Sequence, residues 1–173
     1  MLPTSLAFPL ARRRFVRSTL IAPLAIALTL ITGCGSDAST PTGTPSQPGS
    51  ETFASSLGVS IASFTKKSDD LYVKDLVVGT GSEAINGRRL QVHYTGWLPN
   101  GTQFETSVGR SPIAFTLGAR DVIGGWDQGI LGMRVGGKRR LVIGSNLAYG
   151  STGSGAIGPN TTLIFDVELV SVQ

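Results

Sequence analysis

The sequence has very little of what most enzymes use for metal, redox or nucleophilic chemistry. Its 173 residues include one histidine and one cysteine, and only 15% of the residues are charged. A single histidine excludes a metal site built from several histidines, and a single cysteine excludes an intramolecular disulfide. We therefore expect neither a metal ion nor a cofactor.

The formal net charge of +4 does not indicate a nucleic-acid partner. Four of the 15 basic residues lie within residues 12–17, and all 11 acidic residues follow Cys34, so 11 basic groups balance 11 acidic groups beyond that cysteine. Without a net positive charge, binding to nucleic acid loses its electrostatic basis. We interpret the local run Lys138-Arg139-Arg140 as the solvated edge of a strand rather than as a phosphate site.

Residues 1–33 have the pattern of an export signal. Basic residues precede an apolar stretch, residues 20–31, which is too short to cross a hydrocarbon layer of ~30 Å and is interrupted by Pro23. An uncleaved membrane anchor followed by a chance cysteine is the alternative interpretation. The pair Arg12-Arg13 also leaves open whether export uses the twin-arginine route or the general secretory route.

The sequence Ile31-Thr32-Gly33-Cys34 resembles the lipobox of bacterial lipoproteins. In such proteins the cysteine becomes the lipidated first residue of the mature chain, and several acyl chains anchor it stably to a membrane. We therefore expect lipidation at Cys34 and a location in the bacterial cell envelope, outside the cytoplasm. The sequence leaves open whether the inner or the outer membrane holds the anchor.

Residues 34–70 are predicted to be a flexible linker, and residues 71–173 a single globular domain. Serine, threonine, proline and glycine dominate up to about residue 56, a composition with too little apolar surface to offset the entropy of ordering. Residues 57–70 are ambiguous and are compatible with either an ordered arm or more linker. The remaining residues, about 100, are enough for one hydrophobic core.

The hydrophobic pattern of the domain predicts several strands and one short helix. Apolar residues alternate with polar ones in residues 90–95 and 163–170, and branched residues favour strands at 71–78, 113–117 and 139–143. Ile123, Trp126, Ile130 and Met133 recur at helical spacing. This combination predicts an α+β fold in which an antiparallel sheet packs on the helix.

Three motifs that resemble catalytic or cofactor sites are given structural interpretations. The G-x-G-x-x-G match at residues 153–158 lacks the following helix of a dinucleotide site, so we interpret it as a surface loop. His93 is interpreted as structural, because no nucleophile is recognisably arranged with it. Asp166 and Glu168 share one face of a strand, and we expect both to be solvated rather than to form a hydrolase pair.

Aromatic and branched apolar residues recur beside tight glycine turns in residues 92–98 and 123–130. With so little acid–base chemistry available, this pattern suggests an apolar, water-poor pocket that acts on a bond by rotating it rather than cutting it. The same aromatic residues are equally compatible with a plain hydrophobic core, and periodicity alone does not decide between the two.

Several segments in order resemble the FKBP-type peptidyl-prolyl cis–trans isomerases, the macrolide-binding immunophilins. The matching segments are residues 92–96, 100–104, 122–129, 135–139, 147–150 and 162–169. The resemblance implies a curved antiparallel sheet wrapped across one short helix, and catalysis of rotation about X–Pro peptide bonds. Proline-containing polypeptides are the implied substrates, and exported proteins the expected clients. Tacrolimus and rapamycin are the implied inhibitors.

The resemblance also implies a pocket with Trp126 as its floor. In the family, the equivalent of Tyr149 donates a hydrogen bond to a substrate carbonyl, and the backbone N–H at Ile123 offers a second donor. The implied catalytic residues are Tyr94, Phe104, Glu105, Trp126, Tyr149 and Phe165. The implied substrate-binding residues are Arg110, Ile113, Phe115, Val122, Ile123 and Ile157.

Three departures from the family pattern keep a second function open. Glu105 replaces the usual aspartate, the position of Ile113 is often aromatic, and Gly158 replaces the first of two prolines. The alternative is a weakly active or inactive module that binds proline-containing segments as a holdase. Nothing in the sequence indicates an oligomer interface, and we expect a monomer.

Overall fold

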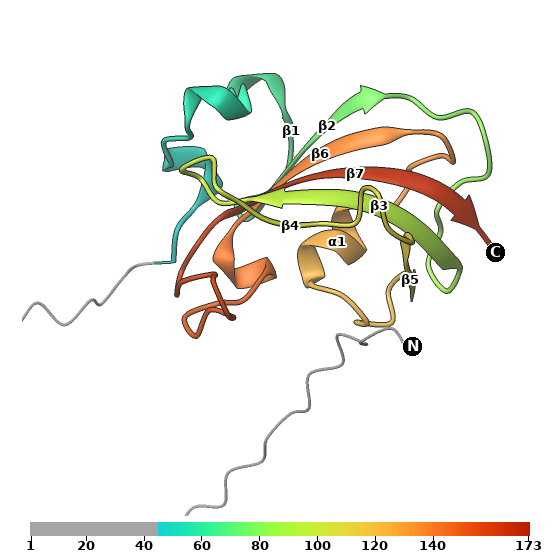
Figure 1. The fold of residues 1–173 in the computed structure, drawn as a ribbon. Helices are drawn as coiled ribbons and strands as arrows, with labels where there is room; N and C mark the ends of the chain where they lie inside the picture. Colours follow the sequence, from blue (N-terminus) through green and yellow to red (C-terminus); the bar gives the residue numbers. More distant parts are fainter. Residues whose placement is uncertain (1–44) are drawn as a thin grey trace, which may run out of the picture. The chain divides into compact units, whose positions relative to one another are not determined.

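Seven antiparallel strands form one sheet that lies across a short helix (Figure 1). This computed structural model describes residues 45–173, so the expected signal, Cys34 and residues 35–44 of the expected linker lie outside the described residues. Within residues 45–173, no helix has the length and apolar character needed to cross a bilayer. The α+β fold class expected from the sequence is confirmed.

The strands pair in the order β1-β2-β6-β7-β3-β4, and β5 pairs with the same edge of β3 as β4 does. Among residues 45–173 there is one α-helix, α1, at Gly124–Gly129, and there are four 3-10 helices: η1 Pro48–Ser50, η2 Ser55–Leu57, η3 Ile61–Ser63 and η4 Ser145–Leu147. The strands are β1 Thr65–Ser68, β2 Leu71–Val77, β3 Arg89–Trp97, β4 Gln103–Thr106, β5 Ile113–Thr116, β6 Lys138–Ile143 and β7 Leu163–Val172.

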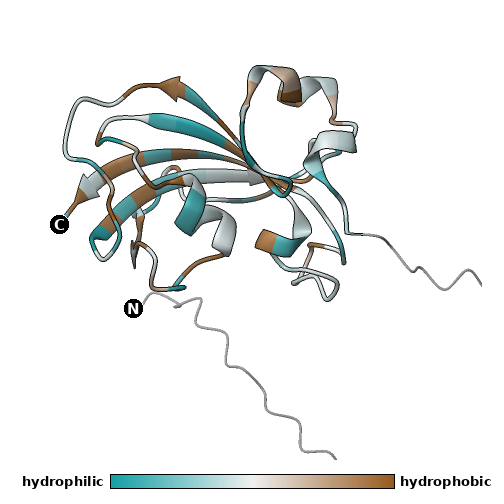
Figure 2. Ribbon diagram, turned by 180° about the vertical axis from the view of Figure 1, so that it is seen from behind, coloured by the Kyte–Doolittle hydropathy of each residue, from teal (hydrophilic) through white to brown (hydrophobic). Residues whose placement is uncertain are grey.

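The longest strands, β3 and β7, lie next to each other and show the expected alternation of burial. Every second residue of β3, from Leu90 to Gly96, is buried, while the residues between them are partly exposed. Figure 2 shows the same alternation as bands of hydrophobic and hydrophilic colour along the strands. Successive side chains of a strand point to opposite faces, so the buried set forms the inner face that covers α1.

Helix α1 lies directly on β6 because two of its residues have no side chain. A Cβ atom added at Gly125 would lie 2.4 Å from Ile143 Cγ2, and one at Gly129 would lie 2.8 Å from Leu141 Cδ2. These glycines weaken the helix as an isolated segment, and they permit its close approach to the sheet. The helix is therefore shorter than the periodic pattern indicated, although Ile130 and Met133 still reach the core.

The basic run on β6 is matched by carboxylates on the two neighbouring strands. Lys138 pairs with Glu168 and Arg140 with Asp166, both on β7, while Arg139 pairs with Asp75 on β2. These pairs follow the register of the sheet, in which the same residues are direct neighbours. Asp166 and Glu168 therefore serve as partners in cross-strand ion pairs rather than as a hydrolase pair, but both are partly buried instead of fully solvated as expected.

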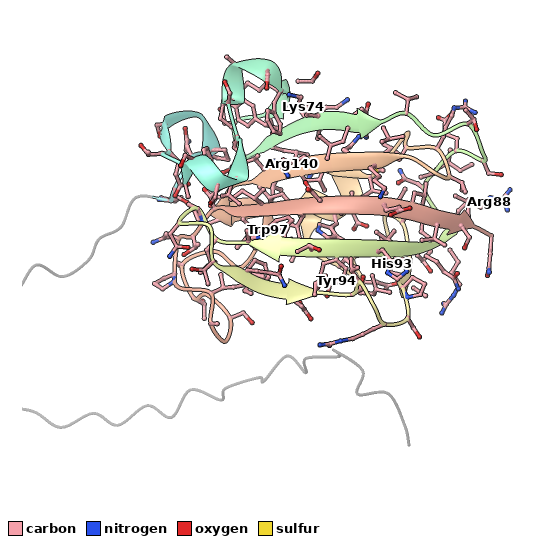
Figure 3. The ribbon with its side chains drawn as sticks, turned by 45° about the horizontal axis from the view of Figure 1, so that its top comes forward. Lys74, Arg88, His93, Tyr94, Trp97 and Arg140 are labelled. Atoms are coloured by element: carbon pink, nitrogen blue, oxygen red, sulfur yellow. The ribbon has the colours of Figure 1, made fainter. Side chains whose placement is uncertain are left out.

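Part of the expected linker is ordered. Residues 45–64, here called the arm, contain η1, η2 and η3, and strand β1 follows. Figures 1 and 3 show the arm on the side of the sheet opposite α1, next to Trp97 and Arg140. For residues 57–64 the structure agrees with the ordered arm that the sequence left open, whereas the order of residues 45–56 was hidden by their serine, threonine, proline and glycine.

The apolar residues of the arm pack against an apolar patch on the outer face of the sheet. Leu57 is 8% exposed and packs with Tyr72, Val142 and Ile164, of which the last two are fully buried. Partly buried side chains surround this second core: Phe53, Ala54, Val59, Ile61, Phe64 and Trp97. Burial of apolar surface at ~25 cal/mol per Å² offsets the entropy of ordering the arm.

We predict that Arg140→Met destabilises the protein by about 2 kcal/mol, because it leaves Asp166 partly buried without its bidentate partner. Lys138→Met is the matched control on the same face of β6. Its pair with Glu168 is about half exposed, with side-chain exposures of 50% and 42%, so we expect a loss below about 1 kcal/mol. Urea unfolding of both variants measures the difference, and equal losses would contradict the prediction.

Candidate functional site

Aromatic rings from four strands lie together around Trp126 of α1 and its neighbour Phe165. The Trp126 ring lies 5.0 Å from Tyr94, 5.4 Å from Phe165 and 5.8 Å from Phe115, measured between ring centroids. Phe104 extends the cluster, with its ring 5.6 Å from Phe165. Three of these contacts are edge-to-face, with interplanar angles of 78° to 87°, an arrangement that aromatic quadrupoles favour.

Trp126 lies at the centre of the cluster and is only 4% exposed. Within residues 45–173 its indole Nε1 is buried and has no hydrogen-bond partner. The residue before α1, Ile123, adopts an extended conformation, and its carbonyl accepts the Trp126 N–H at 2.9 Å. The start of the helix therefore fixes the ring against the inner face of the sheet.

Gly96 on β3 makes room for two of the rings. A Cβ atom at this position would lie 2.6 Å from Phe104 Cζ and 2.8 Å from Phe165 Cε1. Any larger residue would push both rings away from the cluster. Sequence reasoning did not single out Gly96 as a site determinant, and a glycine in the interior of a strand is the signal that was available.

The structure brings the expected site residues together from segments far apart in the chain. Ile113, Val122 and Ile123 are partly buried and pack on the hydrophobic core that contains the aromatic cluster, and Ile157 is 8% exposed in the loop before β7. Tyr149 follows η4 and is 38% exposed. Phe115 is more deeply placed than expected, since it is 3% exposed and supports the Trp126 ring from within the core.

Burial and nearby charges shift the pKa values of the two tyrosines of the site. Burial raises the pKa of Tyr94, and the charge and hydrogen bond of Glu105 raise it further, while the charge of Arg110 acts in the opposite direction. Burial and then Glu105 also raise the pKa of Tyr149. Glu105 and Arg110 do not form one of the ion pairs of the described residues, and the charge of Glu105 acts on the hydroxyls of both tyrosines.

His93 has a structural partner that the sequence did not reveal. Its Nδ1 atom lies 3.1 Å from Ser107 Oγ, which also accepts the backbone N–H of Tyr94 at 2.9 Å. Ser107 is 7% exposed, and its carbonyl accepts the Arg110 N–H at 3.0 Å. The histidine therefore helps to hold the segment between β4 and β5, and the distance of 14 positions between His93 and Ser107 hid the pair.

The G-x-G-x-x-G segment forms a tight turn. Ser154 and Ile157 exchange two backbone hydrogen bonds of 2.9 Å, and Gly153 and Gly155 have positive φ angles. Residues 159–162 then lead into β7 rather than into a helix. The segment thus lacks the strand–turn–helix arrangement of a dinucleotide site and instead places Ile157 in the same hydrophobic core as the aromatic cluster.

Residues 81–170, which are 90 of the 173 residues, match the family of FKBP-type peptidyl-prolyl cis-trans isomerases. The chain belongs to this family. The FK506-binding protein of Neisseria meningitidis serogroup A is 52% identical over 104 residues, which cover 59% of this chain and 95% of that protein. The peptidyl-prolyl cis-trans isomerase FKBP15-3 of Arabidopsis thaliana is 44% identical over 120 residues, 68% of this chain and 84% of the relative.

A solved structure agrees with the FKBP assignment. The crystal structure of a peptidyl-prolyl cis-trans isomerase from Pseudomonas syringae pv. tomato is 38% identical and superposes with a TM-score of 0.58, covering 64% of this chain and 81% of that one. The chain is thus a peptidyl-prolyl cis–trans isomerase, and the alternative of an inactive binding module is not favoured. FKBP proteins bind proline-containing substrates and ligands of the FK506 type.

We predict that Tyr94 keeps its proton well above pH 10, the ordinary pKa of tyrosine. Because folding raises the pKa, the unfolded chain ionises first. This contribution to the free energy of unfolding is therefore full below about pH 10 and is lost as the pH rises through the pKa of the folded state.

Ultraviolet difference titration against Tyr94→Phe measures the pKa of Tyr94. Glu105→Gln should lower that pKa while leaving it above the ordinary value, since burial is the larger cause. A pKa near 10 for Tyr94 in the folded protein would contradict the prediction.

Proposed function

We propose that this FKBP isomerase acts on exported polypeptides outside the cytoplasm, as a monomer anchored to the cell-envelope membrane through lipidated Cys34. The export-signal pattern of residues 1–33 and the lipobox-like Ile31-Thr32-Gly33-Cys34 support the location. Ten residues, 35 to 44, separate Cys34 from the first described residue. Fully extended, they reach about 35 Å, so the anchored enzyme would work close to the membrane surface.

The observation that carries the proposed mechanism is the edge-to-face aromatic cluster around Trp126. We propose that the substrate proline ring packs against this cluster, between the partly exposed side chains of Phe104 and Val122. The hydroxyl of Tyr149, a residue that is 38% exposed, and the Ile123 N–H would donate hydrogen bonds to substrate carbonyls. Within the described residues, the Ile123 N–H donates to no backbone acceptor, so it is available for this role.

The chemistry requires no proton transfer or covalent intermediate. Rotation about an X–Pro bond has a barrier near ~20 kcal/mol, because it breaks the amide resonance. The planar amide is more polar than the twisted one, so transfer from water to an apolar surface favours the twisted state. A site that fits the proline ring of the twisted substrate selects the same state by shape. Arg110 and Glu105 would then orient the polar groups that flank the proline.

We predict that Tyr149→Phe lowers kcat/KM for a short Leu-Pro-Phe peptide about tenfold, the value of one hydrogen bond. Tyr72→Phe is the control, because it removes the same hydroxyl from the outer face of the sheet. The cis–trans relaxation rate of the peptide, measured with residues 35–173, gives both values. Tacrolimus should block the reaction, and full activity of Tyr149→Phe would overturn the role assigned to its hydroxyl.

If Cys34 carries the lipid anchor, membrane attachment depends on this one side chain. Cys34→Ser should move the protein from the membrane fraction to the soluble fraction, and mass spectrometry of the wild-type protein should find acyl chains on Cys34. Isomerase activity of the released protein should equal that of residues 35–173. A Cys34→Ser protein that stays in the membrane fraction would show that residues 1–33 act as an uncleaved anchor.

A further inference from the structure

Two residues of the site depend on an edge strand with little support of its own. Phe104 and Glu105 lie on β4, which has only four residues and is the last strand of the sheet. It pairs only with β3, and the register shifts between Gly96 and Trp97. The position of β4 therefore depends on the turn that connects it to β3.

That turn lies against the arm. The Ala54 N–H donates a hydrogen bond of 2.8 Å to the Pro99 carbonyl. A Cβ atom added at Gly101 would lie 2.9 Å from Ser56 Oγ and 3.3 Å from Ala54 Cβ, so the arm and the turn are in close contact. Trp97, the last residue of β3, packs into the same apolar patch.

The arm is itself fixed to the centre of the sheet. The Leu57 carbonyl accepts a hydrogen bond from Arg140, whose guanidinium is held by both carboxylate oxygens of Asp166. The side chain of Leu57 is buried on the outer face of the sheet. A hydrogen bond of 2.9 Å between Ser46 and Thr162 fixes the start of the arm.

The arm lies outside the part of the chain that matches the FKBP family, which begins at residue 81. The Neisseria meningitidis relative aligns over 104 residues, which is 95% of its length. This chain has 129 described residues, from 45 to 173. The described part of the chain is thus longer than an FKBP domain needs to be.

We propose that the arm is a positioning element of the isomerase site, in which Ala54 and Leu57 hold the β3–β4 turn and thereby fix Phe104 and Glu105. The apolar residues of the arm pack in the second core, whereas Trp126 and Phe165 belong to the first. Its effect passes through the backbone of the turn into β4. This role is independent of whether the protein is anchored to a membrane.

Ala54→Pro tests the proposal with a minimal change. Ala54 has a φ angle of −56°, which proline adopts without strain, so the substitution removes the N–H that bonds to Pro99. Ser55→Pro is the matched control, because Ser55 is the first residue of η2, where proline is well tolerated, and the Ala54 N–H remains.

We expect Ala54→Pro to lower kcat/KM and tacrolimus affinity by roughly three- to tenfold relative to Ser55→Pro. A displacement of site residues by about 1 Å can lower the rate of an enzyme by up to about 100-fold. Assays are run where near-ultraviolet circular dichroism shows both proteins folded. The pKa of Tyr94 should fall in Ala54→Pro, because Glu105 moves away from it.

Leu57→Ala and Leu57→Met provide a second, independent pair. Leu57→Ala removes the side chain that docks the arm and should lower kcat/KM, whereas Leu57→Met conserves its volume and should restore it. Equal kcat/KM and equal tacrolimus affinity in Ala54→Pro and Ser55→Pro would overturn the proposal. So would a Leu57→Ala protein that is as active as Leu57→Met.

Discussion

The packing of Trp126 between α1 and the sheet is the constraint on which the rest of the structure depends. A helix of six residues is not stable alone, so α1 exists only because its inner surface is buried. Gly125 and Gly129 bring its backbone against β6, and the Trp126 ring fills the remaining space next to Phe165. The contact that holds the fold together is therefore also the floor proposed for the substrate.

The sequence predicted those parts of the fold that depend on local pattern. Alternation along β3 and β7 gave their faces correctly, and helical spacing located α1. The four residues of β4 have no such pattern, and Phe104 among them is covered by the ring of Phe165, which β7 supplies. Gly96 is similar: its role follows from Phe104 and Phe165, which approach it only in the folded chain.

The arm shows why composition is a weak guide to order. The composition predicts a linker up to about residue 56 and leaves residues 57–64 open, but the order of the arm depends on single positions, among them Phe53 and Leu57, and on the residues that they contact. The matching feature lies on the outer face of the sheet, where Val142 and Ile164 are fully buried although their neighbours along each strand face the core. A prediction of the arm required knowing that these two strands are adjacent.

The polar residues of the site suit a reaction that moves no proton, because they keep hydrogen-bond donors in place. Tyr94 and Tyr149 can donate hydrogen bonds only while they are protonated, and both burial and the Glu105 carboxylate favour the protonated form. The charge of the same carboxylate acts on both hydroxyls, although burial is the larger cause of each raised pKa. In addition to the proposed role of Glu105 beside the substrate proline, this residue therefore acts on the protein's own hydrogen-bond donors. Because Glu105 lies on the short edge strand β4, its effect on the pKa of both tyrosines depends on where that strand lies, even in an enzyme without acid–base catalysis.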